Sequence, residues 1–409
     1  VANGLQQIKN DHGASAIGAL VSPHSTVEEL YLAGKLVRGV GSENIDYRLR
    51  NAEFTAAQGV QWLGMPIATL SNLQSALVVG SNLRKDHPLF AQRIRQAAKK
   101  GCKVFSINDR VYDWALPVAA SVVAAGDWAQ ALADVAAAVA EAKDVTAPVT
   151  GQAHDEAKAI AAALLAGEQK AVLLGNAAAH HAQASTLLAL ANWIAEQTGA
   201  TAGYLTEAAN TVGAQWVKAV PAAGGMNAAQ MISGNVKAAI LLNVEPEFDS
   251  AAGKAAVAGL NKAQMVVTLS PFKANMEFSD VLLPIAPFTE TSGSFVNAEG
   301  RLQSFHAVVK PLAETRPAWK VLRVLSNLMG VKGVDYETSQ DVLVAATAGA
   351  TQVPASVLSN AAKAVSAVSA GNVAAPVVAS IYQLDSIVRR ATSLQLTADA
   401  RQVREGGAA

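Results

Sequence analysis

A polar, glycine-punctuated segment, ETSGSFVNAEGR at residues 290–301, holds the residue types best suited to binding chemistry. Gly293 and Gly300 permit a tight backbone path, from which hydroxyl, amide and charged side chains can point in several directions. A short apolar run at 265–270 precedes it and predicts a buried strand, because it is brief and β-branched; a second run, at 281–284, follows. The pattern therefore predicts a binding loop at a strand end.

A second group of polar residues lies between 75 and 110. Residues 75–80 and 103–108 predict buried strands, and 89–100 predict the helix that joins them. A strand, loop, helix and strand of these lengths form a right-handed βαβ unit, whose ligands bind at the carboxyl ends of the strands. The candidate residues there are Ser81, Asn82, His87, Asp109 and Arg110. NAD is not supported, since Gly80 is the only glycine where a G-x-G-x-x-G fingerprint would stand.

Metal and nucleophile chemistry has little support in the residues. The single cysteine, Cys102, excludes an internal disulfide and any cysteine-ligated iron–sulfur cluster within this chain. His180 and His181 have no nearby ligands that would complete a metal set, so we expect structural or solvent-facing roles for them. G-x-S-x-G, P-loop and H-E-x-x-H motifs are absent.

Composition limits the remaining classes of function. The 409 residues are long enough for two or three domains, and 51% are apolar. Lys+Arg and Asp+Glu are both 32, so no net field favours nucleic acid or an anionic membrane. No apolar stretch reaches the roughly 20 residues of a spanning helix. The start, VANGLQQIKNDHG, lacks a signal-peptide pattern and reads as helix, so we expect a fragment of a longer protein.

The remaining pattern predicts further strands and helices. A helix should begin near Ser25 and Thr26, with Glu28 and Glu29 in its first turn as capping residues. Strands are expected at 16–21, 170–175 and 237–243, and helices from Asp127 and over 182–199. From Thr338 the chain is rich in Ala, Ser and Val and gives no clear elements; the last ten residues are expected to be disordered.

Several motifs in order resemble the molybdopterin oxidoreductase family. They are SDVLLP, the 290–301 loop, RPAWKVLRVLSNLMG, the segment Leu77 to Arg110 and VKAAILLNVEP at 236–246. The ending IYQLDSIVRRATSLQLTADA, at 381–400, is similar to the G-subunit family of bacterial NADH:quinone oxidoreductase, respiratory complex I. The resemblance implies an α/β fold of two Rossmann-like doubly wound units, as in formate dehydrogenase and DMSO reductase, one inserted in the other. The implied divisions are 1–70 and 205–330 for the first unit, 71–204 for the inserted unit and 331–409 for an Ala-rich terminal segment.

The resemblance also implies positions for a cofactor cleft, which we expect to be vestigial. The cleft candidates are Ser81, Asn82, His87, Asp109, Arg110, Glu245, Gly293, Asn297, Gly300 and Arg301. Asn44 and Asp46 match the family's N-x-D-x-R element, although a loop or capping role is expected for them. Asn243 replaces a glycine that would let a cofactor approach closely, and Cys102 occupies a strand-entry position typical of a buried small residue. These departures argue against bound molybdopterin and against a metal ligand.

Function follows from the resemblance rather than from visible chemistry. It implies a non-catalytic structural domain in the peripheral arm of complex I, contacting other arm subunits on the cytoplasmic side of the bacterial inner membrane. Iron–sulfur clusters are expected in an amino-terminal region outside this chain. The first alternative is a fragment of an active molybdopterin-dependent enzyme of the formate dehydrogenase or nitrate reductase type. The second is an NAD-dependent dehydrogenase, which the missing glycine fingerprint opposes.

Overall fold

The chain forms two compact units in the computed structural model, which describes residues 1–363, 365, 368 and 379–401. Unit 1 contains residues 1–50 and 208–358, and unit 2 contains residues 51–207 and 359–409. The sequence placed these divisions after residues 70, 204 and 330. The first lies earlier because the segment near Trp62 pairs with a strand of unit 2, where the Tyr204 N–H donates to the Trp62 carbonyl at 2.9 Å. The last lies later because the Val353 N–H donates to the Gly300 carbonyl of unit 1 at 2.8 Å.

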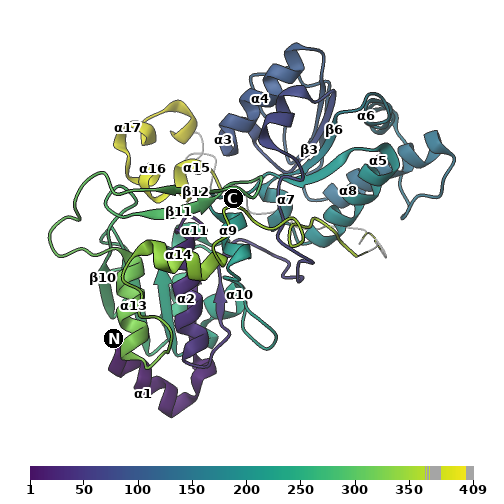
Figure 1. Cartoon of the computed structure of the whole chain (residues 1–409). Helices are drawn as coiled ribbons and strands as arrows, with labels where there is room; N and C mark the ends of the chain where they lie inside the picture. The colour runs from purple at the N-terminus through teal and green to yellow at the C-terminus, as the bar shows by residue number, and fades with distance from the viewer. Residues whose placement is uncertain (364, 366–367, 369–378, 402–409) are drawn as a thin grey trace. The chain divides into compact units, whose positions relative to one another are not determined.

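Unit 1 is built around a parallel sheet in the order β10-β9-β8-β1-β2. Figure 1 labels the edge strand β10 and several helices of this unit. Its strands are β1 (Ile17–Val21), β2 (Ile45–Asp46), β8 (Ala238–Leu242), β9 (Met265–Ser270) and β10 (Val281–Pro284). Its helices are α1 (Ala2–His12), α2 (Val27–Gly39), α9 (Thr211–Trp216), α10 (Ala228–Gln230), α11 (Pro246–Asp249), α12 (Lys254–Leu260), α13 (Ala318–Leu328) and α14 (Ser339–Thr347). Helix α2 packs against α13 and α14. The strands expected at 16–21, 237–243, 265–270 and 281–284 are confirmed.

Helix α2 begins with the capping arrangement that its sequence predicts. The Thr26 hydroxyl accepts the Glu29 N–H at 3.3 Å, and the Glu29 carboxylate accepts the Thr26 N–H at 2.9 Å. Two backbone donors of the first turn are thereby satisfied, which fixes where the helix starts.

Unit 2 has a parallel sheet in the order β5-β4-β3-β6-β7. Its strands are β3 (Ser75–Val79), β4 (Lys103–Asn108), β5 (Ala120–Val123), β6 (Lys170–Leu174) and β7 (Thr201–Tyr204). Its helices are α3 (Leu83–Asp86), α4 (Pro88–Lys99), α5 (Trp128–Lys143), α6 (Asp155–Leu165), α7 (Asn176–His180), α8 (Ala184–Thr198), α15 (Ile381–Leu384), α16 (Ser386–Arg390) and α17 (Thr392–Gln395). The alanine-rich α5 packs against α6 and α8, where small side chains permit close approach.

Both sheets confirm the predicted fold class, two doubly wound parallel α/β units, and residues 51–207 of unit 2 are inserted between the two segments of unit 1. One local expectation was wrong. The 290–301 segment is part of an antiparallel hairpin, β11 (Gly293–Val296) and β12 (Leu302–Phe305), rather than a loop throughout. Each of its strands is only four residues long and contains polar residues, so neither shows a recognisable strand pattern in the sequence. Of the terminal segment expected to be disordered, residues 402–409 lie outside the described residues.

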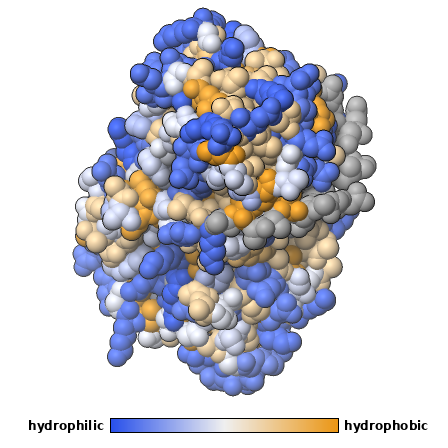
Figure 2. All heavy atoms as spheres, turned by 90° about the vertical axis from the view of Figure 1, so that its right-hand side faces the viewer, coloured by the Kyte–Doolittle hydropathy of each residue, from blue (hydrophilic) through white to orange (hydrophobic). Residues whose placement is uncertain are grey.

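The surface shows no broad apolar band on the face in Figure 2, where hydrophobic residues lie in small groups among polar ones. In the part of the chain that the structure describes, every helix is too short or too polar to span a lipid bilayer.

Candidate functional site

The carboxyl edge of the unit 2 sheet brings several predicted residues together. Strand β3 lies at the switch point, because β4 and β5 follow on one side of it and β6 and β7 on the other. After β3, the Ser81 N–H donates to Asn108 Oδ1 at the end of β4, at 3.0 Å. The Asn82 N–H donates to Asp86 Oδ2 at 2.8 Å. The ends of β3 and β4 and the start of α3 are therefore tied into one polar cluster.

Asp86 belongs to this cluster, although it was not among the candidate residues named from the sequence. Burial raises the pKa of its carboxyl to about 6, an effect partly offset by hydrogen bonds from Asn82 and Ser81 and by nearby His180. A carboxyl group with such a pKa can exchange a proton near neutral pH. The signal that could have revealed it is its place in the polar segment that follows a buried strand.

His87 is 7% exposed, and its ring stacks on Phe90 with centroids 5.8 Å apart. Burial lowers the pKa of His87 to about 4, so the imidazole is neutral at physiological pH. Its Nε2 has no hydrogen-bond partner among the described residues.

Other buried polar atoms at the same edge also lack partners within the described residues. They are Asn82 Oδ1, Asn108 Nδ2 and Asn176 Oδ1. With His87 Nε2, these atoms belong to residues at or after the carboxyl ends of β3, β4 and β6. Buried polar atoms are partnered in the large majority of cases, so each exception calls for a cause. The edge of unit 2 therefore keeps hydrogen-bonding capacity for water or a polar ligand. Asn108 and Asn176 were not predicted as site residues, because neither belongs to a ligand-binding motif that the sequence shows.

Asp109 and Arg110 pair with each other and with Tyr112. Arg110 Nε lies 2.9 Å from Asp109 Oδ2, and the Tyr112 hydroxyl donates to Asp109 Oδ1 at 2.8 Å. The Arg110 side chain is 72% exposed. This pair can contact a ligand only from the solvent side of the edge.

His180 and His181 are both buried and have structural roles, one of the two kinds of role expected. His180 Nε2 contacts the Glu207 carboxylate. His181 Nε2 bonds the Gly126 carbonyl at 2.8 Å, and its ring stacks on Trp128 at 5.3 Å. They hold α7, the start of α5 and the segment after β7 together.

The corresponding edge of unit 1 is bridged by the chain itself. Between β1 and β8, Asn243 Nδ2 donates to Ser25 Oγ at 3.0 Å. Asn210 donates from Nδ2 to the Ser25 carbonyl at 2.8 Å and accepts the Val296 N–H at 2.9 Å. Asn243 has a φ of +54°, a conformation that Asn tolerates better than most residues. Its side chain thus occupies the position where the resemblance expects a glycine.

The other unit 1 candidates shape turns. The Glu245 N–H donates to Asp249 Oδ2 at the start of α11. Asn297 Oδ1 accepts the Arg301 N–H at 2.9 Å, within the turn that joins β11 to β12. Gly300 has a φ of +87° in that turn, and Arg301 Nε lies 3.4 Å from Glu299.

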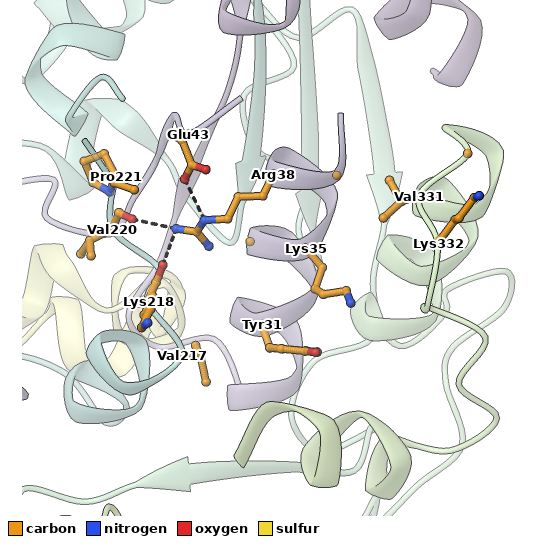
Figure 3. Close-up of a pocket in the computed structure, with 14 residues that line it drawn as sticks. Tyr31, Lys35, Arg38, Glu43, Val217, Lys218, Val220, Pro221, Val331 and Lys332 are labelled. Carbon is orange, nitrogen blue, oxygen red and sulfur yellow. Dashed lines mark hydrogen bonds and ion pairs between the residues drawn. The ribbon is translucent and has the colours of Figure 1, made fainter. Parts of the chain in front are cut away.

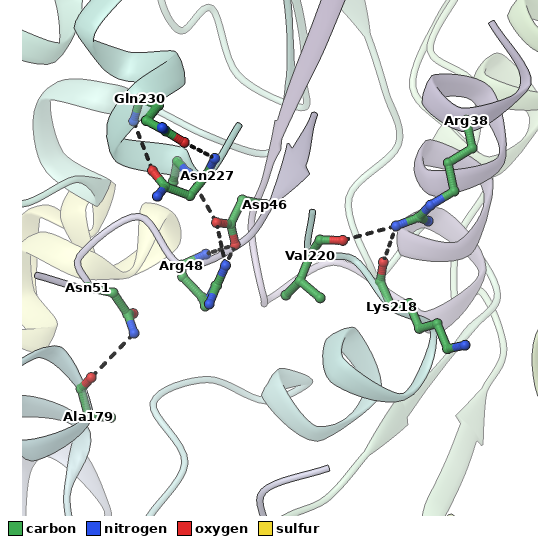
Figure 4. A network of polar contacts seen from close by, with 10 residues as sticks. Arg38, Asp46, Arg48, Asn51, Ala179, Lys218, Val220, Asn227 and Gln230 are labelled. Atoms are coloured by element: carbon green, nitrogen blue, oxygen red, sulfur yellow. Dashed lines mark hydrogen bonds and ion pairs between the residues drawn. The ribbon is translucent and has the colours of Figure 1, made fainter. Parts of the chain in front are cut away.

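Gly293 and the N-x-D-x-R residues are also used for packing and hydrogen bonding inside unit 1. A Cβ at Gly293 would lie 2.4 Å from Thr26 Cγ2, so only glycine lets β11 approach α2 there. The Asp46 carboxylate accepts hydrogen bonds from Arg48 Nε at 2.9 Å and Arg48 Nη2 at 3.0 Å (Figure 4). It also accepts the Ala228 N–H at 3.0 Å. Asn44 accepts the Met226 N–H at 2.7 Å. These residues tie the 226–230 segment to β2.

The described residues contain no group of three or more His, Cys, Asp or Glu that could hold a metal ion. Cys102 precedes β4, at the opposite end of that strand from Asn108, and burial raises the pKa of its thiol to about 11. The chain's one thiol is therefore neither ionised nor placed at the cleft edge.

These features define an α/β protein of two Rossmann-like units, with polar clusters at the carboxyl edges of the sheets. The sequence matches the molybdopterin oxidoreductase family over residues 1–328, and the chain belongs to that family.

The chain is similar to several curated oxidoreductases. It is 25% identical to a probable oxidoreductase YjgC of Bacillus subtilis, over 84% of this chain and 42% of that protein. It is 26% identical to the NADPH-Fe(3+) oxidoreductase alpha subunit of Geobacter sulfurreducens, over 80% and 47%. It is 27% identical to the G subunit of NADH-quinone oxidoreductase of Mycobacterium bovis, over 77% and 41%. The chain thus spans less than half the length of each of these relatives.

Two solved structures share the fold. A chain of the formyltransferase/hydrolase complex of Methylorubrum extorquens matches with a TM-score of 0.56 at 17% identity, over 82% of this chain and 98% of that chain. Acetylene hydratase of Pelobacter acetylenicus matches with a TM-score of 0.54 at 13% identity, over 84% and 59%.

The family name implies a molybdopterin group. The carboxyl edges of the two sheets differ in whether their residues could bind such a group. The unit 1 edge does not fit it, because Asn210 and Asn243 both donate hydrogen bonds to Ser25 there. The unit 2 edge has unpartnered polar atoms suited to a polar ligand but has no metal-ligating thiol.

Proposed function

We propose that this chain is a non-catalytic structural domain of a protein of the G-subunit type, in the peripheral arm of an NADH:quinone oxidoreductase. The observation that carries the proposal is the bridged edge of unit 1, where Asn243 and Asn210 bond Ser25 across the β1–β8 crevice. A side chain that completes such a bridge excludes a cofactor from the same space. The 27% identity to a G subunit and the similar ending at 381–400 support the choice of complex.

In this role the chain packs against other peripheral-arm subunits on the cytoplasmic side of the inner membrane. Iron–sulfur clusters would be held by cysteines outside these residues, since such clusters need about four ligands. Exposed apolar side chains beside the hairpin support contact with partners. Val308 is 82% exposed, Leu312 73% and Phe288 51%. Covering such exposed apolar groups with a partner removes them from water, which lowers the free energy of the complex.

A second candidate function is that of a fragment of an active molybdopterin-dependent oxidoreductase of the formate dehydrogenase or nitrate reductase type. The observation in its favour is the set of unpartnered atoms at the unit 2 edge, including Asn82 Oδ1 and Asn176 Oδ1. A polar ligand there would supply their missing hydrogen bonds.

Elemental analysis of the purified chain for Mo, W and Fe, with a fluorescence assay for acid-extracted pterin on the same sample, separates the two. We expect substoichiometric metal and no pterin, also after incubation with added cofactor. Stoichiometric Mo or W with pterin would overturn the structural role.

The assignment to complex I needs a separate test. The encoded protein, tagged at its carboxyl end in cells that encode it, should co-purify with NADH:quinone oxidoreductase activity. Recovery with formate or nitrate activity instead would favour the second candidate.

A further inference from the structure

Unit 1 also has a groove of about 870 Å³, which is lined by other residues than those that form the two polar edges. Its walls are the carboxyl-terminal half of α2 and the segments 217–222 and 330–332 (Figure 3). None of its lining residues belongs to the β1–β8 crevice or to the unit 2 cluster described above. The groove is therefore a separate site that needs its own explanation.

The groove is strongly cationic in a chain without net charge. Its lining contains Lys35, Arg38, Lys218 and Lys332 against one carboxylate, Glu43, which leaves a net charge of +3. Over the whole sequence, 32 basic residues balance 32 acidic ones. Such a local excess attracts negatively charged partners and raises their rate of association.

Arg38 organises one wall and is already occupied. Its Nε lies 2.9 Å from Glu43, and its Nη2 donates to the carbonyls of Lys218 at 2.8 Å and Val220 at 3.0 Å. These contacts hold the 217–222 segment against α2, as Figure 3 shows. The guanidinium is thus a support for the wall rather than a free anion clamp.

The three lysines carry the charge available to a ligand. The ammonium groups of Lys35, Lys218 and Lys332 have no hydrogen-bond or ion-pair partner among the described residues, and Lys35 Nζ lies 5.9 Å from the centre of the Tyr31 ring. They come from three different segments and do not converge on one point. Lys218 has a φ of +58°, so its backbone is held in a strained conformation at the groove wall.

A compact phosphate does not suit this geometry. Phosphate sites use free backbone N–H groups, commonly at a helix N-terminus. Here the N–H groups of Val217, Lys218, Gly330 and Val331 all donate to carbonyls within unit 1.

Apolar side chains share this groove with the cations. Val217, Val220, Pro221 and Val331 line the same groove. In an extended peptide with alternating acidic and apolar residues, the carboxylates can contact the lysines while the apolar side chains contact the apolar lining. We propose that this groove binds an extended acidic and apolar segment of a partner polypeptide.

The proposal does not depend on the role in complex I, so it is tested on the purified full chain. The probe is a fluorescein-labelled peptide of about ten residues that alternates Glu and Val, followed by fluorescence anisotropy. The variant K35Q/K218N/K332Q removes the free cations, and Asn is chosen at 218 because it tolerates positive φ. The matched control K254Q/K273Q/K310Q removes three exposed lysines of unit 1 outside the groove.

We expect the groove variant to bind the peptide at least about ten-fold more weakly, the control to stay within about two-fold, and added salt to weaken binding. A peptide with Gln in place of Glu should not bind. Equal losses in both variants, or no binding of the Glu-Val peptide, would overturn the proposal. Stronger displacement by inorganic pyrophosphate than by unlabelled Glu-Val peptide would also overturn it, by showing a small-anion site.

Discussion

Glu28 offers the sharpest test of the electrostatics inside unit 1. It lies in the first turn of α2, is 2% exposed and accepts hydrogen bonds from the Ser294 N–H at 3.0 Å and the Ser294 hydroxyl at 2.9 Å. Burial raises the pKa of Glu28 from 4.5 to about 7, and neighbouring Glu29 adds to the increase. The perturbation is Glu28→Gln, which mimics the neutral carboxyl in size and hydrogen bonding.

The sign follows from proton linkage. Because the folded pKa lies above the unfolded value, the folded state binds more protons between pH 4.5 and about 7. The wild-type free energy of unfolding therefore falls as pH rises through that window. From pH 5 to pH 8 this carboxyl alone should lower it by about 2.5 kcal/mol, at about 1.36 kcal/mol per unit of pKa difference. Glu28→Gln removes this loss.

The assay is urea unfolding followed by circular dichroism at a series of pH values, for wild type, E28Q and the exposed control E277Q. Asp86 and other carboxyls contribute their own pH dependence, so the informative quantity is the difference between E28Q and wild type. That difference should grow in favour of E28Q by about 2.5 kcal/mol between pH 5 and pH 8, while E277Q follows wild type. Parallel curves for E28Q and wild type would refute the reasoning.

Substitutions at three further positions test packing and the two polar edges, each by thermal or urea unfolding. Gly203→Ala should destabilise unit 2 by several kcal/mol, on the order of 3, because the new Cβ would lie 1.9 Å from the Leu63 carbonyl oxygen; a loss under about 1 kcal/mol would contradict that contact. His87→Leu should be neutral or stabilising by up to about 1 kcal/mol if Nε2 has no ligand, since an unpaired buried polar atom is removed, and a clear loss would show that the imidazole has a partner. Asn243→Gly should cost less than Asn243→Ala, by about 1 kcal/mol, because Gly adopts the φ of +54° freely; equal costs would mean that the bridge to Ser25, not the backbone, governs this position.

The sequence predicted the elements whose signal is local. Strand β9 is a β-branched run ended by a proline, and α2 carries its Thr26 and Glu29 cap in the sequence itself. Parallel pairing followed from the alternation of such strands with helices. These features depend on residues within a few positions of each other, which is why they could be recognised without a structure.

The rest depends on contacts far apart in sequence. The end of the first segment of unit 1 lies near residue 50 because Trp62 pairs with Tyr204, a contact that no local pattern records. Asp86 and Asn176 join one polar edge only after β3 and β6 become neighbours. The short helices α15 to α17 follow a low-complexity segment, and their capping residues, such as Asp385, gave no distinct signal among many polar residues.

The two units solve the same structural problem differently. A doubly wound sheet leaves a crevice where the strand order reverses, and something must fill it. Unit 1 fills it with amide side chains that bond each other's segments, through Asn243 and Asn210. Unit 2 closes the same position by backbone packing, since a Cβ at Gly175 would lie 2.3 Å from the Gly80 carbonyl oxygen. Backbone packing fills volume but supplies no hydrogen bonds to side chains such as Asn82 and His87. Of the two sheet edges, the unit 2 edge is therefore the one at which a polar ligand should bind.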